Sequence, residues 1–206
     1  MPFAVGFVVG SMLSPVIARR VRPAFLMSAG LVIAAGGFLA LAQVDGTSGL
    51  ATIVASTVVF SLGLSPVFTL ANDLIIGAAP PERAGAASAI SETCSEFGGA
   101  LGIAILGSIG TAIYRRAMAG SVVDGVPREA AAAARDTLGG AVVAAEQLPG
   151  LGAALLDTAR KAFTHGLQVT AMTSAVVVMG MAILVMVWLR HVRSVSELAA
   201  ERDAGA

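Results

Sequence analysis

The sequence contains few of the residues from which enzyme and metal sites are built. Its 206 residues include one cysteine, Cys94, and two histidines, His165 and His191. A single cysteine cannot form an internal disulfide, and neither histidine is near it in the sequence, so no metal-ligand set is apparent. No candidate nucleophile is accompanied by a candidate base. We therefore expect no enzymatic activity, no bound metal and no cofactor.

Charge is scarce as well. Charged residues make up 13% of the chain, and 13 basic residues balance 13 acidic ones. This balance provides no basic surface for nucleic acid, which we do not expect as a partner. Hydrophobic residues make up 56% of the sequence and its mean hydropathy is +0.85, values typical of a polytopic membrane protein. The expected partner is the lipid bilayer.

Five apolar segments are long enough, or nearly so, to cross a hydrocarbon core about 30 Å thick, which takes about 20 helical residues. They lie at about residues 3–18, 24–42, 50–77, 84–113 and 167–189, and the first is short. None shows the alternation of polar and apolar residues that a lipid-facing strand needs. The sequence predicts an all-α membrane protein with five transmembrane helices.

One connection, residues 114–166, is much longer than the others. We expect it to contain three short helices, at residues 128–138, 141–148 and 151–165, joined by turns. The third helix would carry an apolar stripe that lies on the membrane surface or caps the protein. The stripe consists of Leu151, Leu155, Ala159 and Phe163.

The distribution of arginine predicts the orientation in the membrane. Arginines occupy the first connection, the third connection and the end of the last span: Arg19, Arg20, Arg22, Arg83, Arg190 and Arg193. By the positive-inside rule these segments and the tail, residues 190–206, are cytoplasmic, and the N-terminus is outside. Arg115 and Arg116 would then lie outside, a weak departure because a loop of this length is translocated largely regardless of its charge.

Two glutamates, Glu92 and Glu96, lie one helical turn apart within the apolar segment 84–113. A carboxylate in the hydrocarbon region costs about 2.5–3.5 kcal/mol on insertion scales, so such residues usually have a partner, a hydrated cavity or a function. Desolvation and like-charge repulsion both favour the protonated form, and we expect the pair to exchange protons as a coupled unit. The alternative is a protonated carboxyl that only stabilises helix packing through a hydrogen bond.

Two further features are candidates for functional or packing roles. Asp73, beside Asn72, either joins the acidic site or pairs with Arg83 near the headgroups. Gly98 and Gly102 form a GxxxG step, which lets another helix backbone approach closely.

Two stretches resemble a known family. Residues 80–102, PPERAGAASAISETCSEFGGALG, resemble the penultimate span of the fourteen-span drug:proton antiporters of the major facilitator superfamily, which include quaternary-ammonium exporters. Residues 14–23, SPVIARRVRP, are similar to the cytoplasmic basic loop of that superfamily. The resemblance aligns the chain with the last five of fourteen spans, in the C-terminal bundle. It implies that Glu92 couples protons or recognises cations, that Glu96 supports it, and that Arg19, Arg20 and Arg22 serve in gating.

The function implied by the resemblance is proton-coupled efflux of cationic or lipophilic drugs across the bacterial inner membrane, with protons and small cationic or lipophilic molecules as partners. Alternating access requires two pseudo-symmetric bundles, which five spans cannot supply. We therefore expect the chain to be the C-terminal part of a larger antiporter whose N-terminal half is missing here, either a split half or a truncated gene model. The alternative is a small membrane scaffold that does not transport and assembles through its glycine-rich helix.

The predicted orientation can be tested with single cysteines. In a Cys94→Ser background, Ser121→Cys should react with a membrane-impermeant maleimide added to intact cells, whereas Ser194→Cys should react only after permeabilisation, because the arginine-rich end is retained inside. Reaction of both cysteines in intact cells would contradict the orientation.

Overall fold

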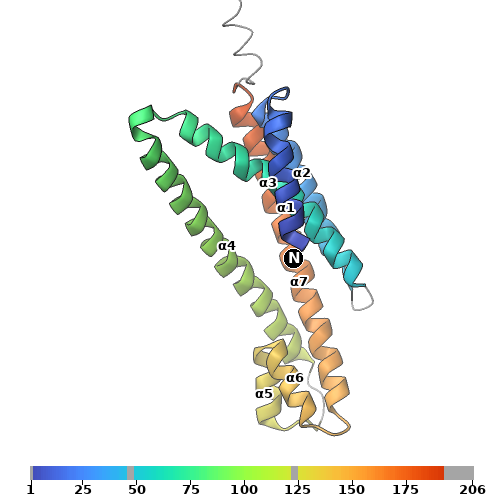
Figure 1. The fold of residues 1–206 in the computed structure, drawn as a ribbon. Coiled ribbons are helices and arrows are strands. Elements are labelled where there is room, and N and C mark those ends of the chain that lie inside the picture. Colours follow the sequence, from blue (N-terminus) through green and yellow to red (C-terminus); the bar gives the residue numbers. More distant parts are fainter. Residues whose placement is uncertain (1, 46–48, 122–124, 193–206) are drawn as a thin grey trace, which may run out of the picture.

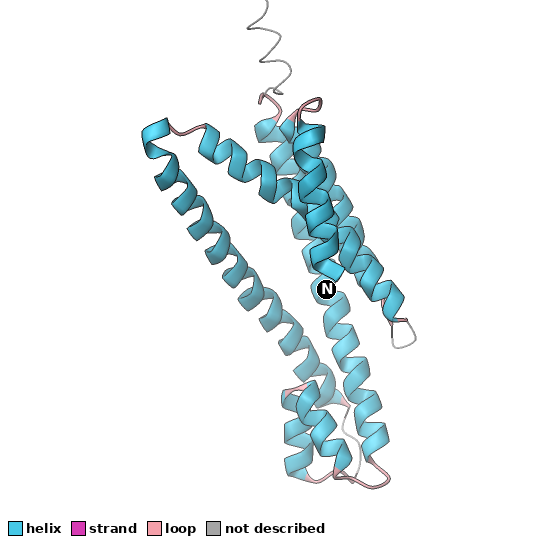
Figure 2. Ribbon diagram, in the orientation of Figure 1, coloured by secondary structure: helices cyan, strands magenta, loops and turns pink. Residues whose placement is uncertain are grey.

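A computed structural model describes residues 2–45, 49–121 and 125–192, and this part of the chain is helical (Figures 1 and 2). No strand occurs among these residues, which confirms the all-α fold. The elements are α1 (Pro2–Ala18), α2 (Pro23–Leu41), α3 (Leu50–Gly77), the 3-10 turn η1 (Pro81–Arg83), α4 (Ala84–Gly120), α5 (Arg128–Asp136), α6 (Leu138–Glu146) and α7 (Gly152–Leu189).

The helices α2, α3 and α7, and α4 together with η1, are long and apolar enough to cross a bilayer. The described part of the chain thus contains four helices with the length and composition of membrane spans, as expected of a multi-pass membrane protein. Helix α1 is also apolar but has only 17 residues, in keeping with the short first segment of the sequence.

Helices α1, α2, α3 and α7 form a bundle that packs through small residues. A Cβ atom on Gly63 of α3 would lie 2.5 Å from the carbonyl oxygen of Gly30 on α2, so the two backbones touch there. Lipid tails are as apolar as leucine, so such close approach replaces the hydrophobic effect as the source of attraction between helices. The Ser28 hydroxyl adds a hydrogen bond from α2 to the carbonyl oxygen of Ala182 on α7, at 3.1 Å.

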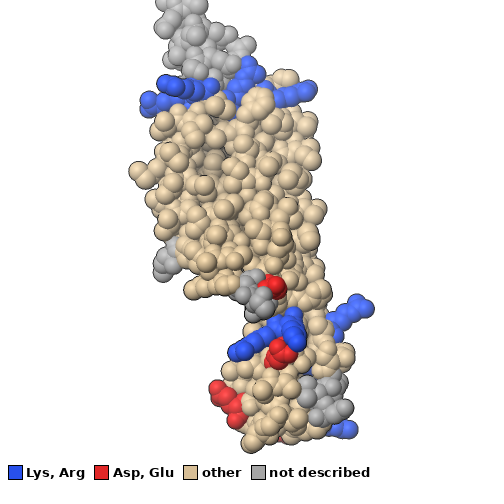
Figure 3. Space-filling model, turned by 90° about the vertical axis from the view of Figure 1, so that its right-hand side faces the viewer, with Lys and Arg blue, Asp and Glu red and all other residues tan. Residues whose placement is uncertain are grey.

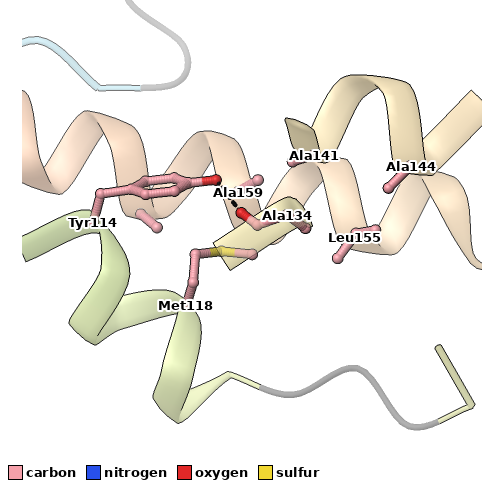
Figure 4. Packing of buried hydrophobic residues seen from close by; sticks show 8 residues of the cluster. Tyr114, Met118, Ala134, Ala141, Ala144, Leu155 and Ala159 are labelled. Atoms are coloured by element: carbon pink, nitrogen blue, oxygen red, sulfur yellow. Dashed lines mark hydrogen bonds between the residues drawn. The ribbon is translucent and has the colours of Figure 1, made fainter. Parts of the chain in front are cut away.

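A second core lies at the far end of α4 and α7, where α5 and α6 pack against them (Figure 4). We call this unit the helical cap. Its buried residues are Tyr114, Met118, Ala134, Ala141, Ala144, Leu155, Ala159 and Ala162. The Tyr114 hydroxyl donates a hydrogen bond of 2.7 Å to the carbonyl oxygen of Ala134, and Arg115 forms an ion pair with Asp136 at 3.3 Å. The cap therefore joins α4 and α7 at their shared end.

The long connection differs from its predicted form. The third predicted helix, residues 151–165, is the first part of α7, which continues without interruption to Leu189. Leu155 and Ala159 are buried in the cap, but Phe163 is 49% exposed. Phe163 lies outside the core of the cap, on the side of α7 that faces α4. Helix α4 likewise extends to Gly120, and the tail from residue 193 lies outside the described residues, as does Ser194.

The glycine contact between α2 and α3 predicts opposite effects of two alanine substitutions. Gly63→Ala should destabilise the chain by about 1–3 kcal/mol, because the added methyl group forces two backbones apart. Gly36→Ala, whose methyl group meets no atom within 4 Å, should be neutral or stabilising by up to about 1 kcal/mol, because alanine favours the helix. Thermal unfolding of the chain in detergent measures both effects, and equal melting temperatures would contradict the packing.

The core of the cap predicts a second pair of effects. Leu155→Ala should cost the cap about 2–5 kcal/mol, because Leu155 is only 3% exposed within the cluster. Val143→Ala, at a side chain that is 56% exposed, should change the stability of the cap by less than about 0.5 kcal/mol. Hydrogen exchange of α5 and α6, followed by mass spectrometry, should accelerate only in Leu155→Ala. Unchanged protection in that variant would show that the cap does not depend on this core.

Candidate functional site

Glu92 and Glu96 lie on one face of α4 and line a groove between α3 and α4 of about 1140 Å³. Helical geometry explains their shared direction, because residues i and i+4 lie one above the other on a helix. Ser91 and Ser95 add hydroxyl groups to the same wall, next to Cys94. Sequence and structure thus agree that the two carboxylates project together.

The opposite wall of the groove is a single face of α3. It consists of Val67, Phe68, Ala71, Asn72 and Ile75. Asn72 is the polar residue of this wall, and Phe68 is its aromatic residue. Sequence reasoning missed both as site residues, although the helical spacing of 68, 72 and 75 within an apolar span places them on one face.

The carboxylates are exposed because α4 packs so little. Of the 37 residues of α4, only Tyr114 and Met118 are buried, and both belong to the cap. Within the described residues, neither Glu92 nor Glu96 has a hydrogen bond or an ion pair. The neighbouring Thr93 hydroxyl bonds instead to the carbonyl oxygen of Ala89 in its own helix, at 2.8 Å. The carboxylates therefore face the groove without a protein partner in the described part of the chain.

A second groove of about 630 Å³ separates α4 from α7 and shares Gly99 and Ile103 with the first. It narrows where the helices cross, since a Cβ atom on Gly166 would lie 3.0 Å from the carbonyl oxygen of Gly110. At Gly98 and Gly102 a Cβ atom would meet nothing within 4 Å. The close approach of α4 therefore occurs at Gly110, and a packing role for Gly98 and Gly102 stays a prediction.

Asp73 lies outside the groove, although the adjacent Asn72 lines it. Its side chain is exposed, and it forms no ion pair with Arg83 among the described residues. The structure therefore brings Glu92 and Glu96 together with Asn72, and leaves Asp73 on a neighbouring face of α3.

The arginine-bearing connections lie toward the same end of the molecule, with η1 set apart from the other two (Figure 1). The connection between α1 and α2, the turn η1 and the C-terminal end of α7 all reach this end (Figure 1). They carry Arg19, Arg20, Arg22, Arg83 and Arg190. Figure 3 shows basic side chains in a row at this end, an uncharged belt across the visible face of the bundle, and mixed charges toward the cap.

Comparison with known proteins yields relatives among drug-resistance proteins. The chain is 39% identical over 192 residues to the multidrug efflux pump LfrA of Mycolicibacterium smegmatis, a match that covers 93% of this chain and 38% of the relative. It is 28% identical to the tetracenomycin C resistance and export protein of Streptomyces glaucescens, over 81% of this chain and 32% of the relative. It is 30% identical to the methyl viologen resistance protein SmvA of Salmonella typhimurium, over 72% of this chain and 30% of the relative.

The chain thus spans about a third of the length of these relatives. The family profile of the Major Facilitator Superfamily matches residues 1–103, which include α1, α2, α3 and the half of α4 that carries both glutamates. Together with the helical membrane architecture, this match shows that the chain belongs to the Major Facilitator Superfamily.

Proposed function

We propose that this chain forms part of a proton-coupled drug exporter, in which Glu92 binds alternately a proton and a cationic substrate. One observation carries the proposal: two carboxylates within an apolar helix face a groove of about 1140 Å³ and have no partner among the described residues. A groove of this size accommodates a drug-sized molecule.

The mechanism follows from the energy of a charge in an apolar environment. An ionised carboxylate without a partner is unfavourable there, so Glu92 is stabilised either by a proton or by a bound cation. The two ligands compete for the same oxygen atoms, so binding of one promotes release of the other. Substrate binding then releases a proton, and protonation from the outer side ejects the substrate.

Glu96 adjusts this exchange without replacing Glu92. Glu96 lies one turn from Glu92 on the same face of α4, so its charge would act on the same proton or cation that Glu92 binds. Removing Glu96 should therefore shift the pH range of exchange, whereas removing Glu92 should abolish the exchange. Asp73, on an adjacent face of α3, contributes to the acidity near the groove rather than to direct binding.

The substrate class is inferred from the groove and from the relatives. The walls of the groove combine apolar side chains with two acidic groups, two hydroxyls and one amide, which favours lipophilic cations. The relatives are named for multidrug efflux, tetracenomycin C and methyl viologen. Transport by alternating access requires two helical bundles. This chain would therefore act as part of a transporter whose length equals that of those relatives.

The orientation in the bacterial inner membrane follows from the arginine-rich end. With that end in the cytoplasm, the N-terminus and the cap lie outside and the C-terminus lies inside. Arg19, Arg20 and Arg22 are then placed to contact anionic headgroups and to serve in gating on the cytoplasmic side.

The proposal predicts the outcome of removing one titrating group. In the transporter that carries this chain, Glu92→Gln should insert normally but release no proton when a cationic substrate is added to the detergent-solubilised protein, because glutamine keeps the shape and cannot titrate. Glu96→Gln should retain proton release with a shifted pH midpoint. Proton release against pH, and efflux of a cationic and a neutral drug from everted vesicles, measure these effects.

Glu82→Gln is the matched control, because Glu82 is exposed in η1 and lies outside the groove. It should leave both proton release and efflux unchanged. If Glu92→Gln released protons and exported every drug as the wild type does, Glu92 would be only a packing residue and the mechanism would be wrong. Assembly without any transport would favour the scaffold.

A further inference from the structure

We propose that Phe68 determines specificity in the groove, where its ring provides a face for flat aromatic cations whose charge is balanced by Glu92 and Glu96 on the opposite wall. This inference rests on the proposed function and adds to it a residue that contacts the substrate. It also names the feature that the substrate must have, a delocalised positive charge on a planar ring.

The position of Phe68 is the first argument. Its side chain is 54% exposed and lines the wall of α3, across the groove from the carboxylates on α4. Among the described residues that line the groove, Phe68 is the only aromatic one, and the others are aliphatic, small or polar. Among the described residues, Phe68 is therefore the one that could stack on a substrate in this groove.

The second argument is that Phe68 has a defined neighbour. The ring of Phe7 on α1 packs edge-on against it, with 5.9 Å between ring centroids and 63° between planes. Phe7 in turn stacks on Phe3, at 5.7 Å and 19°. Such edge-to-face contacts favour one orientation of the ring. Phe7 is therefore a positioning residue. It restricts the ring of Phe68 before a substrate binds, so less side-chain entropy is lost on binding.

The third argument is charge complementarity. A cation over an aromatic face is attracted by the ring's quadrupole, and the attraction grows when water is excluded. Carboxylates on one wall and an aromatic face on the other suit a ligand that is both positively charged and flat. A neutral drug gains little binding energy from the carboxylates or from the ring face. Phe68 should therefore increase the affinity for flat cations and not the affinity for neutral drugs.

The test measures binding to the complete purified transporter that carries this chain. Ethidium is the flat cationic probe, followed by fluorescence, and chloramphenicol is the neutral probe, measured as a transported drug. Phe68→Leu removes the aromatic face and should raise the Kd for ethidium about tenfold, while chloramphenicol transport is unchanged. Phe68→Tyr keeps the face and should bind ethidium as the wild type does.

Two further variants give controls. Phe25→Leu, at an exposed phenylalanine of α2 that does not line the groove, should leave ethidium binding unchanged. Phe7→Leu should raise the Kd for ethidium by less than Phe68→Leu does, because the ring of Phe68 remains but is no longer held in one orientation. The kcat for ethidium transport should stay unchanged. If Phe68→Leu does not fold, Phe68→Met tests the same point, since methionine fills similar space without an aromatic face.

The outcomes separate this inference from the proposed function. Wild-type ethidium affinity in Phe68→Leu or Phe68→Met, together with loss of proton release in Glu92→Gln, would overturn the role of Phe68 and leave the carboxylate mechanism standing. Normal proton release and export in Glu92→Gln would overturn the proposed function whatever Phe68 does. An equal loss of ethidium and chloramphenicol transport in Phe68→Leu would also overturn the inference, because it would indicate a general structural role.

Discussion

The contact between Gly110 and Gly166 is the constraint on which the geometry of the site depends. Because neither residue has a side chain, α4 and α7 touch at their backbones there, and the helical cap fixes the ends beyond the contact. From this contact α4 diverges from α7 toward η1 (Figure 1). The half of α4 that carries Glu92 and Glu96 therefore stands away from the bundle and faces a groove.

The helices of this chain pack in two different ways. Helices α1, α2, α3 and α7 are held along their length by glycine contacts and by the Ser28 hydrogen bond, which makes a firm support. Helix α4 is held at the cap and at Gly110, and its other half leaves the carboxylates accessible. The proposed exchange of a proton for a cation needs such a combination, in which one wall is fixed by packing and the other presents groups that proteins rarely bury without partners.

Much of this arrangement could be predicted from the sequence, and the failures have physical reasons. Apolar length predicted long apolar helices, and i, i+4 spacing placed Glu92 and Glu96 on one face, because both are properties of a single helix. The expected break between a helix ending at residue 165 and one beginning at 167 is absent, because α7 runs from Gly152 to Leu189 and packs first on the cap and then on α2. Phe68 and Asn72 were missed because their place in the groove depends on which face of α3 meets α4, and that is decided by tertiary packing.

Cys94 offers the most direct test of the central claim, that the groove beside Glu92 and Glu96 binds the cationic substrate. Its side chain lines this groove and is exposed, so its reaction rate reports on occupancy of the site. In the complete transporter, a saturating cationic drug should slow the alkylation of Cys94 by a neutral maleimide, and this protection should be lost in Glu92→Gln. Alkylation at the same rate with and without the drug, in a protein that transports it, would contradict the account.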